Sequence, residues 1–194
     1  WGVEVTGSLL PEAGFSQTYN LHVSPNGDFA LTVPTEAGAT SAFGGATWSW
    51  PQSAYRILYS VDAYGFPYFA ASVPRHSVAE TQTALHSIAM TEQGSVFYAN
   101  GTALAHLLKY DFFGSLEWDL DLELDLDDVA IAGTDNDGVI LAFTTNVLID
   151  WGIDPLPLLP GSSSDLILAR YDSAGTLVWV VRPLPSARVL EARI

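Results

Sequence analysis

The most conspicuous chemistry-bearing residues form an alternating acidic stretch, Asp119-Leu120-Asp121-Leu122-Glu123-Leu124-Asp125-Leu126-Asp127-Asp128. Alternation has the period of a strand, so the leucines share one face and the carboxylates the other. We expect a solvated outer strand whose charge protects a sheet edge. The alternative is an acidic ridge that binds a cation or steers a partner, made by Asp119, Asp121, Glu123, Asp125 and Asp127. Calcium needs about six to eight converging oxygens, and carboxylates along one strand converge only with help from another segment.

Other residue types that could do catalysis or bind a metal lack the required spacing. The segment Asp135-Asn136-Asp137-Gly138 resembles the start of a calcium loop, but Thr144 stands where a bidentate glutamate is needed. No two of the four histidines have the spacing of a zinc ligand pair: His22, His76, His86 and His106. The chain has no cysteine, no nucleophile elbow and no glycine-rich phosphate loop. We therefore predict a non-catalytic protein without metal or cofactor. A hydrolase with its site at a central channel is a less favoured alternative.

Three tryptophans fall in segments between expected strands, namely Trp48, Trp50 and Trp151. Exposed loop aromatics can stack on sugar rings or anchor a protein partner. Trp48 and Trp50 would share one face of an extended segment, which suits a flat ligand. The alternative is that they pack on the surface of a sheet. These residues are the basis of a carbohydrate-binding hypothesis.

The composition excludes several classes of protein. The 194 residues include 22 acidic and 7 basic ones, for a net charge of −15, and 48% are apolar. An apolar content this high argues against disorder, and the negative charge argues against nucleic acid or an anionic membrane as partner. No run approaches the roughly 18 apolar residues of a membrane span. The only lysine, Lys109, is interpreted as compositional bias.

The charges are unevenly distributed along the chain. Acidic residues gather in 117–128, whereas Arg182, Arg188 and Arg193 lie close to the end. An acidic strand and a basic tail are compatible with head-to-tail pairing between chains.

Short apolar runs separated by Gly, Pro, Asn and Asp predict an all-β chain, and they recur as a repeat. Each repeat has an apolar strand, Asp-x-x-Gly, and a second strand with an aromatic residue seven positions after the Asp. The pairs are Asp62 and Gly65, Asp111 and Gly114, and Asp172 and Gly175; the aromatics are Phe69, Trp118 and Trp179. The pattern predicts hairpins in which Asp caps the turn and Gly takes a positive φ.

A second turn phrase precedes each hairpin, in which a strand and a polar turn lead to Gly27, Gly94 or Gly138. Two hairpins give four strands per repeat, which is typical of propeller blades. The expected divisions of this single repeat domain are an outer strand at 1–7, repeats at 20–73, 85–122 and 129–183, and a C-terminal tail at 184–194.

The third repeat also resembles a known family. Its segment 161–179, with Ser164-Asp165, Ala169-Arg170-Tyr171-Asp172 and Trp179, is similar to the repeat of bacterial surface and secreted "SBBP" β-propeller proteins, common in myxobacteria. The mid-repeat segments Phe43-Gly44-Gly45 and Asp150-Trp151-Gly152 fit the variable loop of that repeat. The resemblance implies a propeller-type fold and an extracellular or envelope setting, and no particular activity.

Three blades are fewer than the roughly four of the smallest closed propellers, and open ends would expose strand edges. The chain could belong to a longer propeller, complete a ring with copies of itself, or form a less regular sandwich. We predict a β-propeller-like array of about three four-stranded blades, incomplete or closed by association. Its expected role is an interaction or structural module that binds itself or another chain of a larger assembly through blade edges and loops. A glycan-binding module is the alternative.

Overall fold

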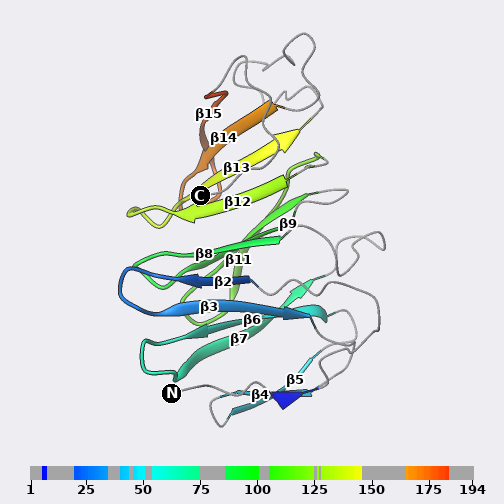
Figure 1. Ribbon diagram of the computed structural model, residues 1–194, viewed down its shortest axis with the longest axis vertical. Coiled ribbons are helices and arrows are strands. Elements are labelled where there is room, and N and C mark those ends of the chain that lie inside the picture. Colours follow the sequence, from blue (N-terminus) through cyan, green and yellow to red (C-terminus); the bar gives the residue numbers. More distant parts are fainter. Residues whose placement is uncertain are drawn as a thin grey trace.

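The computed structural model describes residues 6–7, 20–34, 40–43, 46–50, 54–74, 86–100, 105–124, 126, 128–145 and 165–183, and every regular element in these ranges is a β-strand (Figure 1). These strands form three four-stranded sheets and one three-stranded sheet, and all pairs are antiparallel. The expectation of an all-β array of three four-stranded units is therefore confirmed. No helix in these ranges is long and apolar enough to cross a membrane.

The four-stranded sheets follow one another along the chain. The first contains β2 (Asn20–Val23), β3 (Phe29–Pro34), β6 (Ala54–Val61) and β7 (Pro67–Pro74). The second contains β8 (His86–Met90), β9 (Val96–Asn100), β10 (His106–Tyr110) and β11 (Leu116–Asp121). The third contains β12 (Asp128–Gly133), β13 (Val139–Thr145), β14 (Asp165–Tyr171) and β15 (Leu177–Val181). Within each sheet the strands are neighbours in chain order.

A smaller cap sheet contains β1 (Thr6–Gly7), β4 (Thr40–Phe43) and β5 (Ala46–Ser49). Its hairpin β4–β5 is an insertion between β3 and β6 of the first sheet. Residues 1–7 were expected to form an outer blade strand, whereas Thr6–Gly7 pair with β4 of the cap sheet. The tail 184–194 lies outside the described residues.

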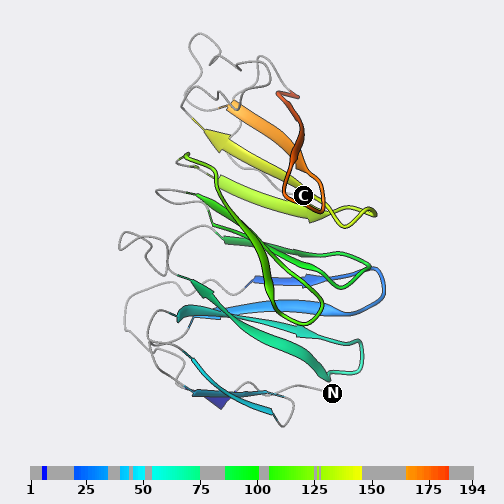
Figure 2. The same cartoon turned by 180° about the vertical axis from the view of Figure 1, so that it is seen from behind.

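The four-stranded sheets pack face to face, as Figures 1 and 2 show from opposite sides. Their first strands lie together, because β8 contacts both β2 and β12. Period-two alternation gives each sheet two apolar faces, and both faces of the middle sheet are covered. Ile88 and Tyr98 face Leu58 and Phe69 of the first sheet. On the other face, Phe97 belongs to the core shared with the third sheet. Burying each such side chain contributes roughly 1.5–3 kcal/mol.

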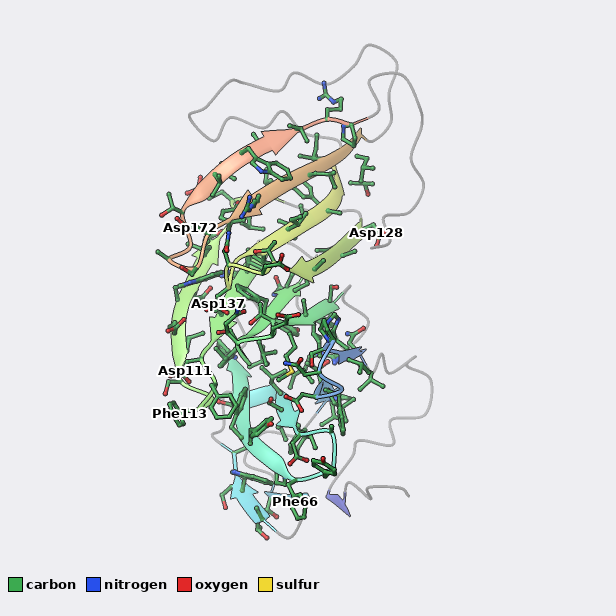
Figure 3. All side chains as sticks on the ribbon, turned by 90° about the vertical axis from the view of Figure 1, so that its left-hand side faces the viewer. Phe66, Asp111, Phe113, Asp128, Asp137 and Asp172 are labelled. Atoms are coloured by element: carbon green, nitrogen blue, oxygen red, sulfur yellow. The ribbon has the colours of Figure 1, made fainter. Side chains whose placement is uncertain are left out.

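The turns gather at one end of the sheets. Turns between first and second strands, here called the inner turns, span 24–28, 91–95 and 134–138. Turns between third and fourth strands, the outer turns, span 62–66, 111–115 and 172–176. In an antiparallel meander both connections emerge on the same side. Figure 3 faces this end of the molecule, with Asp111, Phe113, Asp137 and Asp172 labelled along it.

A polar group lies between the first and second sheets, where His86 of β8 stacks on Tyr98 of β9. Nδ1 of His86 is 2.5 Å from the Tyr98 hydroxyl, and both side chains are buried. Burial, followed by the nearby charge of Arg56, lowers the pKa of His86 from 6.5 to about 3. The imidazole is therefore neutral in the folded protein at neutral pH.

The low pKa of His86 predicts a loss of stability in mild acid. Between pH 6.5 and 3 the unfolded chain binds a proton that the folded chain excludes, so the free energy of unfolding falls as the pH drops through this range. At pH 5 the loss should be about 2 kcal/mol relative to pH 7.5. Urea titrations of the wild type and His86→Gln at both pH values measure it. An equal pH dependence in the two proteins would contradict the assignment.

Candidate interaction site

The outer turns are built by the repeated aspartates. Oδ1 of Asp62 accepts the N–H groups of Tyr64 and Phe66 at 2.9 and 2.8 Å. Asp111 and Asp172 accept the corresponding N–H groups two and four residues on at 2.8–2.9 Å. The glycines take the left-handed conformation, with φ of 92° at Gly65, 83° at Gly114 and 80° at Gly175. The repeat motif thus marks rigid turns, and its carboxylates are engaged in building them.

Exposed aromatic side chains lie on the outer turns of the first and second sheets and at the start of β7, the strand that follows the first of these turns. The fractional exposures are 84% for Tyr64, 68% for Phe66, 81% for Phe113, and 39% each for Tyr68 and Phe112. The ring centroids of Tyr68 and Phe112, from different sheets, are 4.7 Å apart, and those of Phe112 and Phe113 are 5.5 Å apart. We call these five residues the aromatic cluster. Sequence reasoning missed it, although three of the five lie within the repeated turn motif.

The aromatic cluster rests on a fixed base. The Phe112 ring lies over Gly94 of an inner turn, where an added Cβ would approach the ring to 2.5 Å. The Tyr68 hydroxyl donates to Oδ2 of Asp28 at 3.3 Å, while Oδ1 of Asp28 accepts the N–H of Ala63 at 3.0 Å. The inner half of the cluster is therefore positioned, and Tyr64, Phe66 and Phe113 project from it into solvent.

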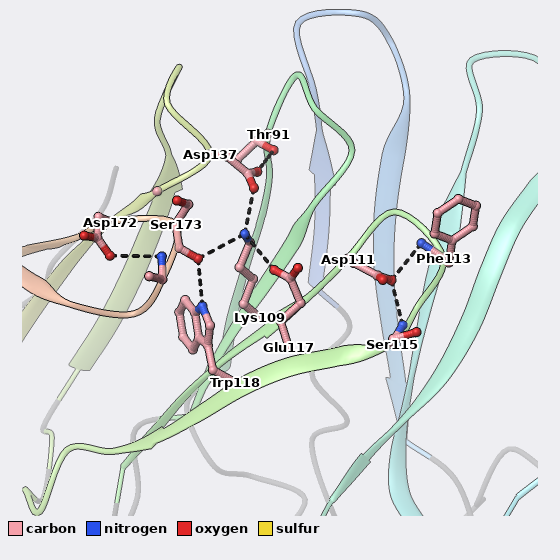
Figure 4. A network of polar contacts seen from close by, with 12 residues as sticks. Thr91, Lys109, Asp111, Phe113, Ser115, Glu117, Trp118, Asp137, Asp172 and Ser173 are labelled. Carbon is pink, nitrogen blue, oxygen red and sulfur yellow. Dashed lines mark hydrogen bonds and ion pairs between the residues drawn. The ribbon is translucent and has the colours of Figure 1, made fainter.

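Lys109 is the centre of the polar contact between the second and third sheets (Figure 4). Its side chain is only 3% exposed. Nζ donates to Oδ2 of Asp137 at 2.6 Å and to the Ser173 carbonyl at 3.2 Å, and forms an ion pair with Glu117 at 2.8 Å. Burial alone would lower the pKa of Lys109, but the hydrogen bonds to Asp137 and Glu117 outweigh it and the pKa is raised. Lys109 thus stays charged and joins the sheets, which corrects its interpretation as compositional bias.

Asp137 occupies a conformation that favours glycine. Its φ is 57°, at the inner-turn position that Gly27 and Gly94 hold in the other sheets. Gly138, with which this turn phrase ends in the sequence, lies one position later. The Asp137 carboxylate bridges the sheets by accepting from Lys109 and, at 2.8 Å, from the Thr91 hydroxyl. Those bonds offset a backbone cost of about 1–2 kcal/mol.

The acidic stretch lies partly on an outer strand and partly in a connection. Asp119 and Asp121 are on β11, where Asp119 accepts from His106 Nδ1 at 2.8 Å. After β11 the chain passes back to β12 of the next sheet (Figure 2). Glu123 breaks the alternation there with a φ of 55°, and its N–H donates to Asp121. Asp125 and Asp127 lie outside the described residues.

The leucines of this stretch hold it in place: Leu122, Leu124 and Leu126 are buried between the second and third sheets. The described carboxylates point outward and are used locally, and they do not form a ridge on one continuous strand. In the ranges that the structure describes, no three His, Asp or Glu side chains gather as a metal site would require.

The described loop tryptophans pack on the protein itself. Trp50 is 8% exposed, and Trp48, half-buried, stacks on it with a centroid separation of 6.5 Å. Trp48 also meets Tyr59 of the first sheet edge to face at 5.9 Å. The cap sheet uses these rings to cover part of the outward face of the first sheet, so they are not the exposed pair that a sugar site would need. Trp151 lies outside the described residues.

The basic tail is described only at its start. Arg182 directly follows β15 and is partly exposed, whereas Arg188 and Arg193 lie outside the described residues.

The comparisons with known proteins show no family. No protein-family model and no curated protein matches the chain. Among solved structures, a protein of unknown function from Bacteroides caccae is 10% identical with a TM-score of 0.37, covering 84% of this chain and 80% of its own. The BBS1N structure in complex with ARL6DN is 13% identical with a TM-score of 0.36, covering 90% and 71%. Both likenesses are distant, so the role of the chain has to be inferred from its own residues.

The Lys109 contact predicts a non-additive pair of substitutions. Lys109→Met leaves the Asp137 carboxylate without its cation and should lower the free energy of unfolding by about 2–4 kcal/mol. Lys109→Met combined with Asp137→Gly should recover about 1 kcal/mol or more, because glycine removes both the unpaired charge and the left-handed strain. Urea denaturation of both variants measures the difference. As a control, Glu117→Gln at the exposed end should cost less than about 1 kcal/mol. A double variant no more stable than Lys109→Met would contradict this account.

Proposed function

We propose that this chain is a non-catalytic interaction and structural module that binds a protein partner through the aromatic cluster at the turn end of its sheets. The observation that carries the proposal is the exposure of Tyr64, Phe66 and Phe113 on two outer turns, with Phe113 beside the packed rings of Tyr68 and Phe112. Exposed aromatic groups on neighbouring turns are a feature of recognition surfaces, and Tyr and Phe are enriched at interfaces. The net charge of −15 favours a partner whose apolar contact is bordered by basic groups.

The buried titratable groups support a structural role for the sheets. His86 is kept neutral beside Tyr98, and Lys109 is held by two carboxylates from different sheets. The aspartates of the outer turns are occupied by backbone N–H groups. These groups have partners that explain their positions, and a rigid frame under an aromatic surface is suited to binding.

The bacterial envelope or secreted setting, and membership of the SBBP-type repeat family, are part of the same proposal. They depend on the resemblance of segment 161–179, together with an array of four-stranded units that suits such repeats.

Glycan binding is the second candidate, and the aromatic cluster now supports it better than the tryptophans do. Tyr64 and Phe113 present open ring faces, and pyranose rings stack on such faces. Asp28 lies beside Tyr68 and could accept from sugar hydroxyls.

The test compares two surface variants. Tyr64→Ser with Phe113→Ser should remove at least about nine-tenths of the partner captured by immobilised protein from the envelope and secreted fractions of the source cells. Its stability should change by less than about 0.5 kcal/mol, because both side chains are exposed. Val178→Ser on β15, where the side chain is 49% exposed, is the matched control and should capture as the wild type does. Equal capture by all three proteins would refute the proposal, and glycan-array binding lost in the same variant would favour the second candidate.

A further inference from the structure

Besides the bond from Thr91 to Asp137, three side chains of the second sheet hold the third sheet at the turn end. These contacts are Gln93 Nε2 to the Asp135 carbonyl at 2.9 Å, Lys109 Nζ to Asp137 at 2.6 Å, and Trp118 Nε1 to the Ser173 carbonyl at 3.0 Å. Two of them have counterparts between the first and second sheets. Asn26 lies 3.5 Å from the Glu92 carbonyl, and Phe69 packs on Gly114 as Trp118 packs on Gly175. Successive sheets are thus joined by a repeated set of contacts.

The third sheet carries the same three groups on its outward face. Asn136 holds the turn position of Gln93, Arg170 the strand position of Lys109, and Trp179 that of Trp118. Arg170 pairs with Trp179 across β14 and β15, as Lys109 pairs with Trp118 across β10 and β11. No side chain of these three residues makes a hydrogen bond or ion pair with the part of the chain that the structure describes. Nε of Arg170 is buried and, among these residues, unsatisfied. An unpaired buried guanidinium nitrogen costs free energy, so a carboxylate partner would be favourable.

At the opposite end of the array, the first sheet exposes apolar side chains that are buried in the second sheet. In the second sheet, the first-strand residues Ile88 and Met90 are 5% and 2% exposed, because they pack against the preceding sheet. Their counterparts in the first sheet, Leu21 and Val23, are 63% and 58% exposed. These apolar side chains point to the side where a preceding sheet would lie.

The first sheet also has a counterpart of each group that the second sheet contacts on the third. The Pro25 carbonyl holds the place of the Asp135 carbonyl, and Gly65, with φ of 92°, holds the place of Gly175 under the tryptophan. Asp28 supplies a carboxylate one position beyond Gly27, the counterpart of Asp137. Its Oδ2 has only the 3.3 Å bond from the Tyr68 hydroxyl and can accept another donor.

From this correspondence we propose that two copies of the chain dock head to tail, the third sheet of one against the first sheet of the other. Arg170 then pairs with Asp28 of the second copy, Trp179 packs on its Gly65, and Leu21 and Val23 become buried. The cap sheet covers Tyr59 through Trp48 and Trp50 and leaves Leu21 and Val23 exposed for the contact. The inference builds on the proposed function, because it names the chain itself as one partner. The contact includes Gly65, next to Tyr64, and does not include Phe113.

Engineered cysteines test the docking directly, because the natural chain has none. Asn136→Cys and Pro25→Cys, each in a separate protein and mixed under mild oxidation, should give a disulfide-linked pair containing one chain of each kind. Asn136→Cys mixed with Thr47→Cys, exposed on β5 of the cap sheet, is the matched control and should remain unlinked. Equal linkage in both mixtures, or none in either, would overturn the proposal.

Native mass provides a second measurement that does not depend on cysteine chemistry. By light scattering, the wild type should exceed the 20.9 kDa of one chain. Arg170→Glu should weaken self-association at least about tenfold, whereas Arg170→Lys, which keeps the charge, should retain most of it. The proposal would be overturned by a wild type that stays monomeric at a protein concentration of about 100 μM. An Arg170→Glu variant whose mass equals that of the wild type would also overturn it.

The two proposals can fail separately. Self-docking is measured in purified protein with no other partner present, and the variant Phe113→Ser, which changes no residue of the proposed contact, should dock as the wild type does. A monomer that still captures a partner through the aromatic cluster refutes only the docking. A self-associating chain that captures nothing refutes only the wider interaction role.

Discussion

The buried ion pair between Lys109 and Asp137 sets the position of the third sheet on the second. A buried ammonium group must be compensated, and Asp137 reaches it from a left-handed turn position. The same nitrogen meets the Ser173 carbonyl, which also accepts from Trp118. One cation therefore links an inner turn, an outer turn and the outer strand, and any sliding of the sheets would break all three contacts together.

Near this ion pair, the sheets also fit together through packing of aromatic rings on glycines. Glycines of the outer turns leave room for an aromatic ring from the preceding sheet, with Phe69 over Gly114 and Trp118 over Gly175. The Asp-x-x-Gly motif thus serves two purposes, since the left-handed glycine closes its own turn and also receives its neighbour. Rigid turns of this kind make the turn end a suitable frame for the exposed aromatic cluster, because a rigid surface loses little conformational entropy on binding.

Several features could be predicted because they depend on local patterns. Alternating apolar residues and turn signals identified the strands, and the spacing of Asp62, Asp111 and Asp172 identified the repeated hairpins. The burial of Leu122 and Leu124 also follows from alternation. Other features could not be predicted, because they depend on contacts distant in sequence. Lys109 meets Asp137 across 28 positions, and Trp50 is buried only because its hairpin folds back over the first sheet.

The sequence by itself determined an all-β chain of three four-stranded units with Asp-capped turns, since period-two burial and turn conformation are properties of short segments. Only the tertiary structure decided which side chains face solvent. Trp50 became part of the core and Trp48 packs against it, whereas the aromatic residues Tyr64, Phe66 and Phe113 remained exposed. The reason is that burial requires a neighbouring face: both faces of the middle sheet have one, and the end sheets keep groups such as Leu21 and Arg170 directed outward.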